Sequence, residues 1–157
     1  MSYDTVPAST FPLSIQTGTV EAPTWTEVAG INSITVTPSR RDADTTTFAN
    51  AGWDQATVVG RGATVAAAGF AMYDASGVKD PGQVACEALA DEIGTAARGT
   101  FRIALPGGKA FEFSGDVNVT PFGGGVSDVA RWEMEIRVAA PASVVTGTPE
   151  EEPAPEA

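Results

Sequence analysis

The chain has 157 residues, the size of a single domain, and its nine basic and twenty acidic side chains give a net charge of −11 at pH 7. This balance disfavours non-specific binding to DNA or to anionic membranes, which requires clustered lysine and arginine. The chain contains no histidine, the commonest general base and metal ligand at neutral pH, and its single cysteine excludes an intrachain disulfide.

The N-terminal segment has neither the basic stretch nor the apolar run of a secretory signal, and no run of about 18 apolar residues occurs anywhere. We therefore expect no membrane partner and a chain that stays in the host cytoplasm unless other machinery carries it out. Residues 1–10 are polar and show no periodicity, which predicts a flexible N-terminal arm. Residues 11–140 are interpreted as one domain.

Four strands are predicted in the first half of the chain, or three if residues 25–28 and 31–37 form one broken strand. Residues 11–16 alternate weakly, residues 25–28 and 31–37 are rich in β-branched side chains, and residues 57–72 form a long run with small side chains on both faces. Between the last two, residues 39–55 have no apolar period but contain Phe48 and Trp53. We expect a long binding loop there, because a disordered linker has little use for aromatic side chains.

One helix is predicted, over residues 81–93. Asp80 can cap its first turn, Pro81 suits the first helical position, and Gly94 is a left-handed stop. The spacing i, i+3, i+4, i+7 predicts an apolar stripe, and polar side chains at 83, 87 and 91 fall on the opposite side. The stripe comprises Cys86, Leu89, Ala90 and Ile93. We interpret the helix as a plug on a β-core and Cys86 as a buried thiol.

Three strands with clear alternation follow the helix. Residues 101–105 and 111–119 are joined by a Pro-Gly-Gly hairpin turn, and residues 132–138 form the last strand, so the pattern is typical of an antiparallel sheet with one wet face. Beyond residue 140 the pattern stops, and proline with clustered glutamate predicts a disordered acidic tail over residues 141–157. The predicted fold is therefore mainly β, an antiparallel sandwich or barrel with one flanking helix.

The residues that chemistry would need are missing. There is no zinc-ligand spacing, no serine in a nucleophile elbow and no base to partner Cys86. We therefore expect no enzyme activity and no cofactor.

The order of features resembles a known family. The quoted segments are W-T-E-V-A-G-I-N-S-I-T-V-T, a Thr-rich loop ending in G-W, D-P-G-Q opening the lone helix, F-R-I-A-L-P-G-G-K as a hairpin, and W-E-M-E-I-R-V as the final strand. The chain resembles the major tail proteins, or tail tube proteins, of long-tailed bacteriophages, particularly siphophages, over roughly residues 11–140. The tube proteins of contractile tails and of type VI secretion share this architecture.

The resemblance implies a structural virion protein. Six subunits would join sheets edge to edge into a ring, and rings would stack into a hollow tube around a tape measure protein, with tail tip and terminator proteins as further partners. DNA would pass through the lumen during ejection. The resemblance also implies that the N-terminal arm and the loop 39–55 make the contacts between rings. The candidate residues there are Arg40, Arg41, Thr46, Phe48 and Trp53.

A tube that carries DNA should have a lumen that repels phosphate, because cationic walls would bind the DNA and slow its transit, and an acidic chain suits this. The polar sides of the last two strands are the candidate lumen face, with Glu112, Asp116, Glu133 and Glu135. Arg131 and Arg137 share that face and weaken the assignment, and the same acids could simply keep an outer face soluble. The alternative function is a stand-alone β-sandwich binding module, such as a capsid decoration or adhesion domain.

Overall fold

The computed structural model of the chain describes residues 2–7, 11–19 and 21–146. Within them it contains eight strands, one α-helix and two short 3-10 turns. The strands are β1 (Leu13–Gln16), β2 (Trp25–Glu27), β3 (Ile31–Asp44), β4 (Ala56–Phe70), β5 (Arg98–Leu105), β6 (Lys109–Gly123), β7 (Arg131–Val138) and β8 (Ser143–Thr146). The helix is α1 (Pro81–Ala90), and the 3-10 turns are η2 (Phe48–Asn50) and η3 (Gly94–Ala97).

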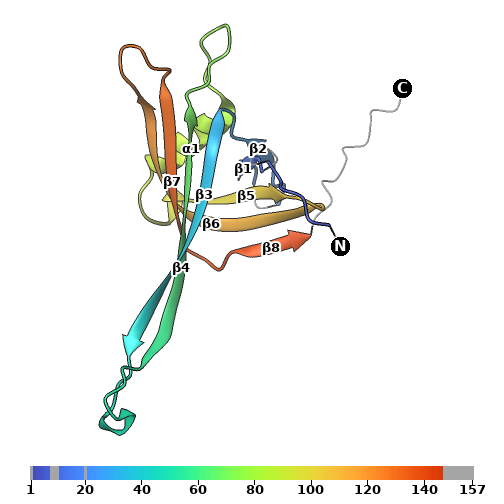
Figure 1. Cartoon of the computed structure of the whole chain (residues 1–157). Coiled ribbons are helices and arrows are strands. Elements are labelled where there is room, and N and C mark those ends of the chain that lie inside the picture. Colours follow the sequence, from blue (N-terminus) through green and yellow to red (C-terminus); the bar gives the residue numbers. More distant parts are fainter. Residues whose placement is uncertain (1, 8–10, 20, 147–157) are drawn as a thin grey trace.

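All the strands belong to one antiparallel sheet with the order β2-β1-β5-β6-β7-β4-β3, and β8 also pairs with β6. The first half of β6 pairs with β5 and β8, and its second half pairs with β7. The sheet bends at β6, so that β5 and β6 run across the direction of β3, β4 and β7 (Figure 1). The predicted mainly β, antiparallel fold with a single flanking helix is confirmed.

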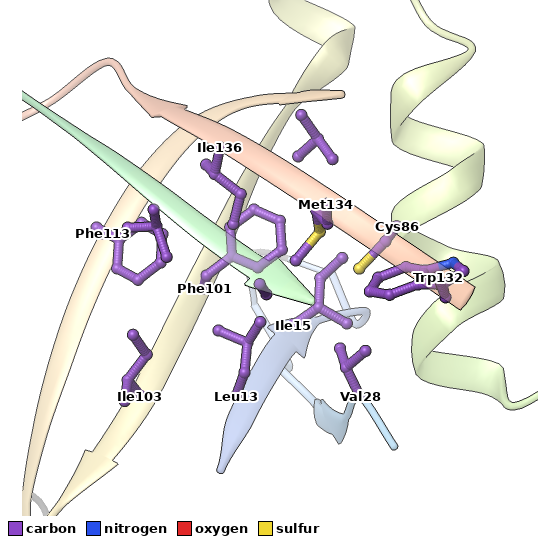
Figure 2. Close-up of a cluster of buried hydrophobic side chains, with 13 residues drawn as sticks. Leu13, Ile15, Val28, Cys86, Phe101, Ile103, Phe113, Trp132, Met134 and Ile136 are labelled. Atoms are coloured by element: carbon purple, nitrogen blue, oxygen red, sulfur yellow. The ribbon is translucent and has the colours of Figure 1, made fainter. Parts of the chain in front are cut away.

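The concave side of the bent sheet holds the core. Strand β7 illustrates how the sequence specifies it, because Trp132, Met134 and Ile136 are buried while the residues between them are exposed. Phe101 of β5 and Phe113 of β6 stack with ring centroids 5.7 Å apart. Figure 2 shows these side chains pointing toward Leu13, Ile15 and Val28, with Cys86 of the helix beside Trp132.

Helix α1 begins as predicted and ends early. The Asp80 carboxylate accepts hydrogen bonds from the amides of Gln83 (3.1 Å) and Ala29 (3.2 Å), so one side chain caps the helix and ties it to the turn after β2. The helix stops at Ala90, where two acids, Asp91 and Glu92, follow. Negative charge at a helix C-terminus opposes the macrodipole and disfavours a further turn.

This early end corrects the predicted core stripe. Cys86 is fully buried, and Leu89 and Ala90 are partly buried against the core, as expected. The prediction for Ile93 is wrong, because it lies outside the helix and is 91% exposed. The prediction that Gln83 faces away from the core is also wrong, because Gln83 is fully buried.

The buried Gln83 side chain joins three backbone segments. Its amide nitrogen donates to the carbonyls of Ala29 (2.9 Å) and Phe70 (2.8 Å), and its oxygen accepts from the Met72 amide (3.1 Å). The helix therefore holds the end of β4 and the turn between β2 and β3 through one residue. The helix also approaches the chain closely at Gly82, where an added Cβ would lie 2.3 Å from the Glu27 carbonyl oxygen.

Two predicted boundaries need correction. The loop expected at 39–55 is shorter, because β3 continues to Asp44 and only residues 45–55 form the connection. The tail expected from 141 includes strand β8, which pairs with β6. The rest of that tail, 147–157, lies outside the described residues, as do residues 1 and 8–10 of the expected arm. The described part of the arm, residues 2–7, has no helix or strand.

Candidate assembly surfaces

Strands β3 and β4 form a hairpin that extends beyond the rest of the sheet (Figure 1). Strand β7 covers β4 only from Thr64 to Phe70, whereas β3 and β4 pair as far as Asp44 and Ala56. We call the uncovered part, residues 38–63, the hairpin arm. An isolated two-stranded ribbon is marginally stable in water, so a ribbon of this length is typical of an element that contacts something else.

The tip of the hairpin arm is ordered by its own polar groups. The Thr45 amide donates to the Gln55 carbonyl (2.8 Å), and the Gln55 amide donates to the Thr46 hydroxyl (2.9 Å). The Thr46 hydroxyl and amide also lower the pKa of Asp44, which therefore stays ionised. All of these hydrogen bonds lie within the tip itself.

The same tip leaves its aromatic side chains in solvent. Phe48 is fully exposed and Trp53 is 80% exposed, and no described residue covers either ring. Large apolar side chains held on an ordered, exposed loop are typical anchors of a protein interface, because little conformational entropy is lost when they dock. The predicted binding loop is thus preformed, with its two aromatic residues outward.

A second group of exposed apolar residues lies at the opposite end of β4. It is carried by the turn Tyr73–Lys79 and by residues 122–130, which connect β6 to β7, and we call it the loop end. Because β4 and β7 are antiparallel, residues that precede β7 lie beside Phe70, the end of β4 farthest from the hairpin tip (Figure 1). The exposed members are Tyr73, Val78, Phe122, Val126 and Val129.

The loop end is fixed to the helix by charged and polar contacts. The Lys79 ammonium donates to the Glu87 carboxylate and to the Pro121 carbonyl (3.2 Å), and the Trp132 indole also donates to Glu87 (3.0 Å). The Lys79 side chain is 12% exposed, so this pair is largely shielded from solvent. The loop end is therefore a defined surface, and sequence reasoning missed it because loop residues carry no periodicity.

The four candidate lumen acids lie on the wet face of β6 and β7, away from the core. Cross-strand register places Glu135 opposite Asn118, Glu133 opposite Thr120, and Asp116 opposite Arg137. Glu112 lies farther along the same side of β6, opposite Arg102 of β5. We call this surface the polar face.

The polar face is close to electrically neutral. Glu112 pairs with Arg102 (3.0 Å), and Asp116 pairs with Arg98 (3.3 Å). Arg131 and Arg137 flank Glu133 and Glu135 on β7. In a chain of net charge −11, four arginines gathered beside four acids make this face less negative than the rest of the molecule.

Residues 2–7, 11–19 and 21–146 contain no group of three or more His, Cys, Asp or Glu side chains placed to hold a metal ion. Within the same residues, no helix has the length and apolar character of a membrane span.

Chains with the same overall fold occur in solved particle structures. No family model and no curated protein sequence matches the chain. A chain in the tail of an empty gene transfer agent particle, obtained by helical refinement with C6 symmetry, superposes with a TM-score of 0.67 at 16% identity. The match covers 90% of this chain and 99% of that one.

Two other structures agree. A chain in the native gene transfer agent virion gives a TM-score of 0.60 at 15% identity, covering 90% of this chain and 99% of that one. A chain in the six-fold symmetrised baseplate of the anti-feeding prophage gives a TM-score of 0.54 at 8% identity, and the match covers 92% of this chain and 97% of that one. At these identities the likeness establishes a shared fold, and it extends over nearly the whole of each chain.

Proposed function

We propose that this chain is a tail tube protein of a phage-like particle. Copies assemble into hexameric rings, and the rings stack into a tube. The fold is shared with chains of two kinds of particle, a gene transfer agent and an anti-feeding prophage, so it does not specify a siphophage. The hexameric ring is inferred from the six-fold symmetry of two of those structures.

The observation that carries the proposal is the placement of two exposed apolar surfaces at opposite ends of β4. The hairpin tip presents Phe48 and Trp53 at one end, and the loop end presents Val126 and Val129 at the other. When two different surfaces of a chain bind each other, association is head to tail and continues without closing. An arm that reaches from one ring to the next would use this geometry to build a tube.

In this arrangement Arg40, Arg41, Thr46, Phe48 and Trp53 belong to the contact between rings. The aromatic side chains supply the apolar anchor, and Thr46 orders the tip that carries them. We assign the N-terminal arm, whose described residues 2–7 form no helix or strand, to the same contact.

The polar face is the proposed lumen wall, with Glu112, Asp116, Glu133 and Glu135. Because arginines balance these acids, the wall would be nearly neutral, and a neutral wall binds phosphate weakly, as DNA transit requires. The lumen would hold a tape measure protein before DNA passes, and tail tip and terminator proteins would close the tube. The role is structural, without catalysis, and its place is the virion.

Negative-stain electron microscopy of the purified protein tests the proposal. We expect tubes or stacked rings with six-fold class averages, and a length that grows with protein concentration. A chain that stays monomeric at high concentration, even with tape measure and tail tip proteins added, would contradict it. That result would favour the alternative of a stand-alone binding module.

A further inference from the structure

The charged side chains of the hairpin arm are separated along its length. Three of the nine basic residues of the chain, Arg40, Arg41 and Arg61, lie in two adjacent rungs of the β3–β4 ladder. We call them the arginine cluster. Arg40 and Arg61 are direct cross-strand partners, and like charges in this position destabilise a ribbon.

The arginine cluster has little compensation within the chain. Arg40 pairs with Asp42 at 3.4 Å, and both side chains are exposed. Among the described residues, neither Arg41 nor Arg61 has an acidic partner. Arg41 lies opposite Gly60 and Arg61 opposite Arg40, so the two guanidinium groups project from opposite faces of the ribbon. An unfavourable cluster on an exposed arm indicates a binding surface for carboxylates.

Toward the tip the sign of the charge reverses. Asp42 and Asp44 end β3, and Asp54 precedes β4. From the body outward, the arm therefore presents arginines, then aspartates, then the aromatic residues of the tip.

The loop end carries charges in the complementary order. Asp74 and Asp128 lie in its two loops and are exposed, and Arg131 begins β7 behind them. Backbone amides hold both carboxylates in place: those of Ser76 (2.8 Å) and Val78 (2.9 Å) bind Asp74, and that of Gly125 (2.9 Å) binds Asp128. Acids thus lie at the outside of this end, with a cation behind them.

The spacings of the two patterns are of similar size, and the one on the arm is the larger. Arg40 and Asp44 are four residues apart on one strand, about 13 Å at the rise of an extended chain. Asp128 and Arg131 are three residues apart, at most about 10 Å. Figure 1 shows the two loops at the end of the molecule opposite the hairpin tip.

We propose that the arginine cluster binds Asp74 and Asp128 of a second copy of this chain, while the acids of the arm approach Arg131 of that copy. This pairing sets how far the arm overlaps its neighbour, so that Phe48 and Trp53 meet the apolar residues of the loop end in one register. It rests on the proposed stacking of copies and identifies the surface that receives the arm.

Charge reversal on each side tests the pairing. The first variant, Arg41→Glu with Arg61→Glu, breaks no ion pair within the chain. The second carries Asp74→Lys with Asp128→Lys. Each variant alone should raise the protein concentration needed for tube formation at least about tenfold, because like charges then face each other across the contact.

Mixing the two variants provides the decisive observation. The first has acidic arms and acidic loop ends, and the second has basic arms and basic loop ends, so an arm of either fits a loop end of the other. An equimolar mixture should restore tubes seen by electron microscopy. A mixture that forms none, although each variant melts as the original chain does, would overturn the pairing.

Controls separate this proposal from the proposed function. Lys109→Glu and Glu21→Lys change exposed charges away from both surfaces and should leave tube formation unchanged. Asp74→Asn with Asp128→Asn keeps acceptors for the turn amides and should still weaken assembly. If the original chain forms tubes and all charge variants do so equally well, the pairing is wrong while the tube function stands. If the original chain forms none, the proposed function itself fails.

Discussion

Gln83 shows how a single side chain can have a different role from the one its sequence position suggests. Its spacing with the acids at 87 and 91 predicts a solvent-facing polar side, yet it is fully buried and binds three backbone groups. Its position in the first turn explains this, because that turn lies against the ends of β2 and β4, whereas Glu87 and Asp91, farther along the same side, are more exposed. Periodicity describes the helix and does not say which of its ends is covered.

Replacing Gln83 with leucine keeps the side-chain volume and removes all three hydrogen bonds. The carbonyls of Ala29 and Phe70 and the Met72 amide would then be buried without partners, at a cost of about 3 kcal/mol in the free energy of unfolding. Urea denaturation measures this. Gln55→Leu, at an exposed position, should change stability by less than about 0.5 kcal/mol. Equal effects would show that the buried network does not stabilise the fold.

Cys86 gives a pH-dependent prediction. Burial, with the negative charges of Glu87 and Asp80, raises the pKa of its thiol from an ordinary value of 9.0 to about 12. Between these values the unfolded chain loses the thiol proton and the folded chain keeps it, so stability falls as pH rises, by about 1.4 kcal/mol per unit. Below pH 9 the thiol is protonated in both the folded and the unfolded chain, so it adds no pH dependence to the stability.

The measurement is the free energy of unfolding at several pH values for the original chain and for Cys86→Ala. The variant should lack this part of the slope above pH 9, although its stability at neutral pH is lower. A thiol reagent at pH 8 should also react with Cys86 only on unfolding, whereas an added cysteine at the exposed Val126 position reacts at once. If the free energy of unfolding falls with pH equally steeply in the original chain and in Cys86→Ala above pH 9, the thiol of Cys86 does not have the raised pKa.

At the scale of elements, the packing of the helix against the core extends to its last turn, at Leu89 and Ala90. Leu89→Ala should cost roughly 1–3 kcal/mol, less than the loss of a fully buried leucine, because Leu89 is only partly buried. Ile93→Ala should have almost no effect, because Ile93 lies beyond the helix and is exposed. Thermal melts of the two variants compare them directly. A larger loss for Ile93→Ala would mean that the helix packs differently.

The tip of the hairpin arm should affect assembly without affecting the fold. Phe48→Ala and Trp53→Ala remove exposed rings that contact no core residue, so the melting temperature should change little. Tube formation, followed by sedimentation and electron microscopy, should be strongly reduced. Val144→Ala on β8 removes a half-exposed apolar side chain elsewhere and provides the control. Unfolding of Trp53→Ala would place that ring in the core.

Sequence patterns located most helices and strands. They failed where both faces of a strand are exposed to solvent, because no alternation of apolar and polar residues then marks the strand. The strands β5, β6 and β7 alternate because one side is buried, and they were predicted closely. The outer part of β3, with Arg40, Arg41 and Asp42, is exposed on both sides, so no alternation marks it as strand. The short β8 is likewise mostly exposed and is held by its backbone pairing to β6.

The candidate surfaces divide in the same way. Aromatic side chains in a stretch without periodicity pointed to the tip of the arm, and the structure leaves them exposed. The loop end could not be found from residue types, because its apolar residues come from two separate segments that only the pairing of β4 with β7 brings to one end. Neutrality of the polar face also depends on cross-strand pairing with Arg98 and Arg102, which the sequence does not reveal.

At the scale of the whole molecule, the hairpin arm and the loop end are different surfaces, and the outer part of the arm can be removed while the loop end is kept. Replacing residues 42–59 with an Asn-Gly turn joins Arg41 to Gly60, which are already cross-strand partners. The shortened chain should fold, because the deleted segment carries no core residue. It should form no tubes alone.

The shortened chain should also stop the growth of tubes formed by the full chain. Its loop end accepts an arm, whereas its own arm keeps only the arginine cluster and has lost the aspartates and the aromatic tip. Tubes grown with a small molar fraction of the shortened chain should be measurably shorter in electron micrographs. A shortened chain that also carries Asp74→Lys and Asp128→Lys should no longer shorten the tubes. Tubes of unchanged length in the first experiment would contradict head-to-tail assembly through the arm.

The unbroken course of β4 from the arm into the body has a mechanical consequence. Its 15 residues pair with β3 along the arm and with β7 in the body, so the tip and the core share one continuous backbone. A pull on the tip along the strand loads all the hydrogen bonds of both ladders in shear, whereas a sideways force opens them one rung at a time. The arm should therefore be stiff in tension and compliant in bending, so that a chain of such contacts can curve without growing longer.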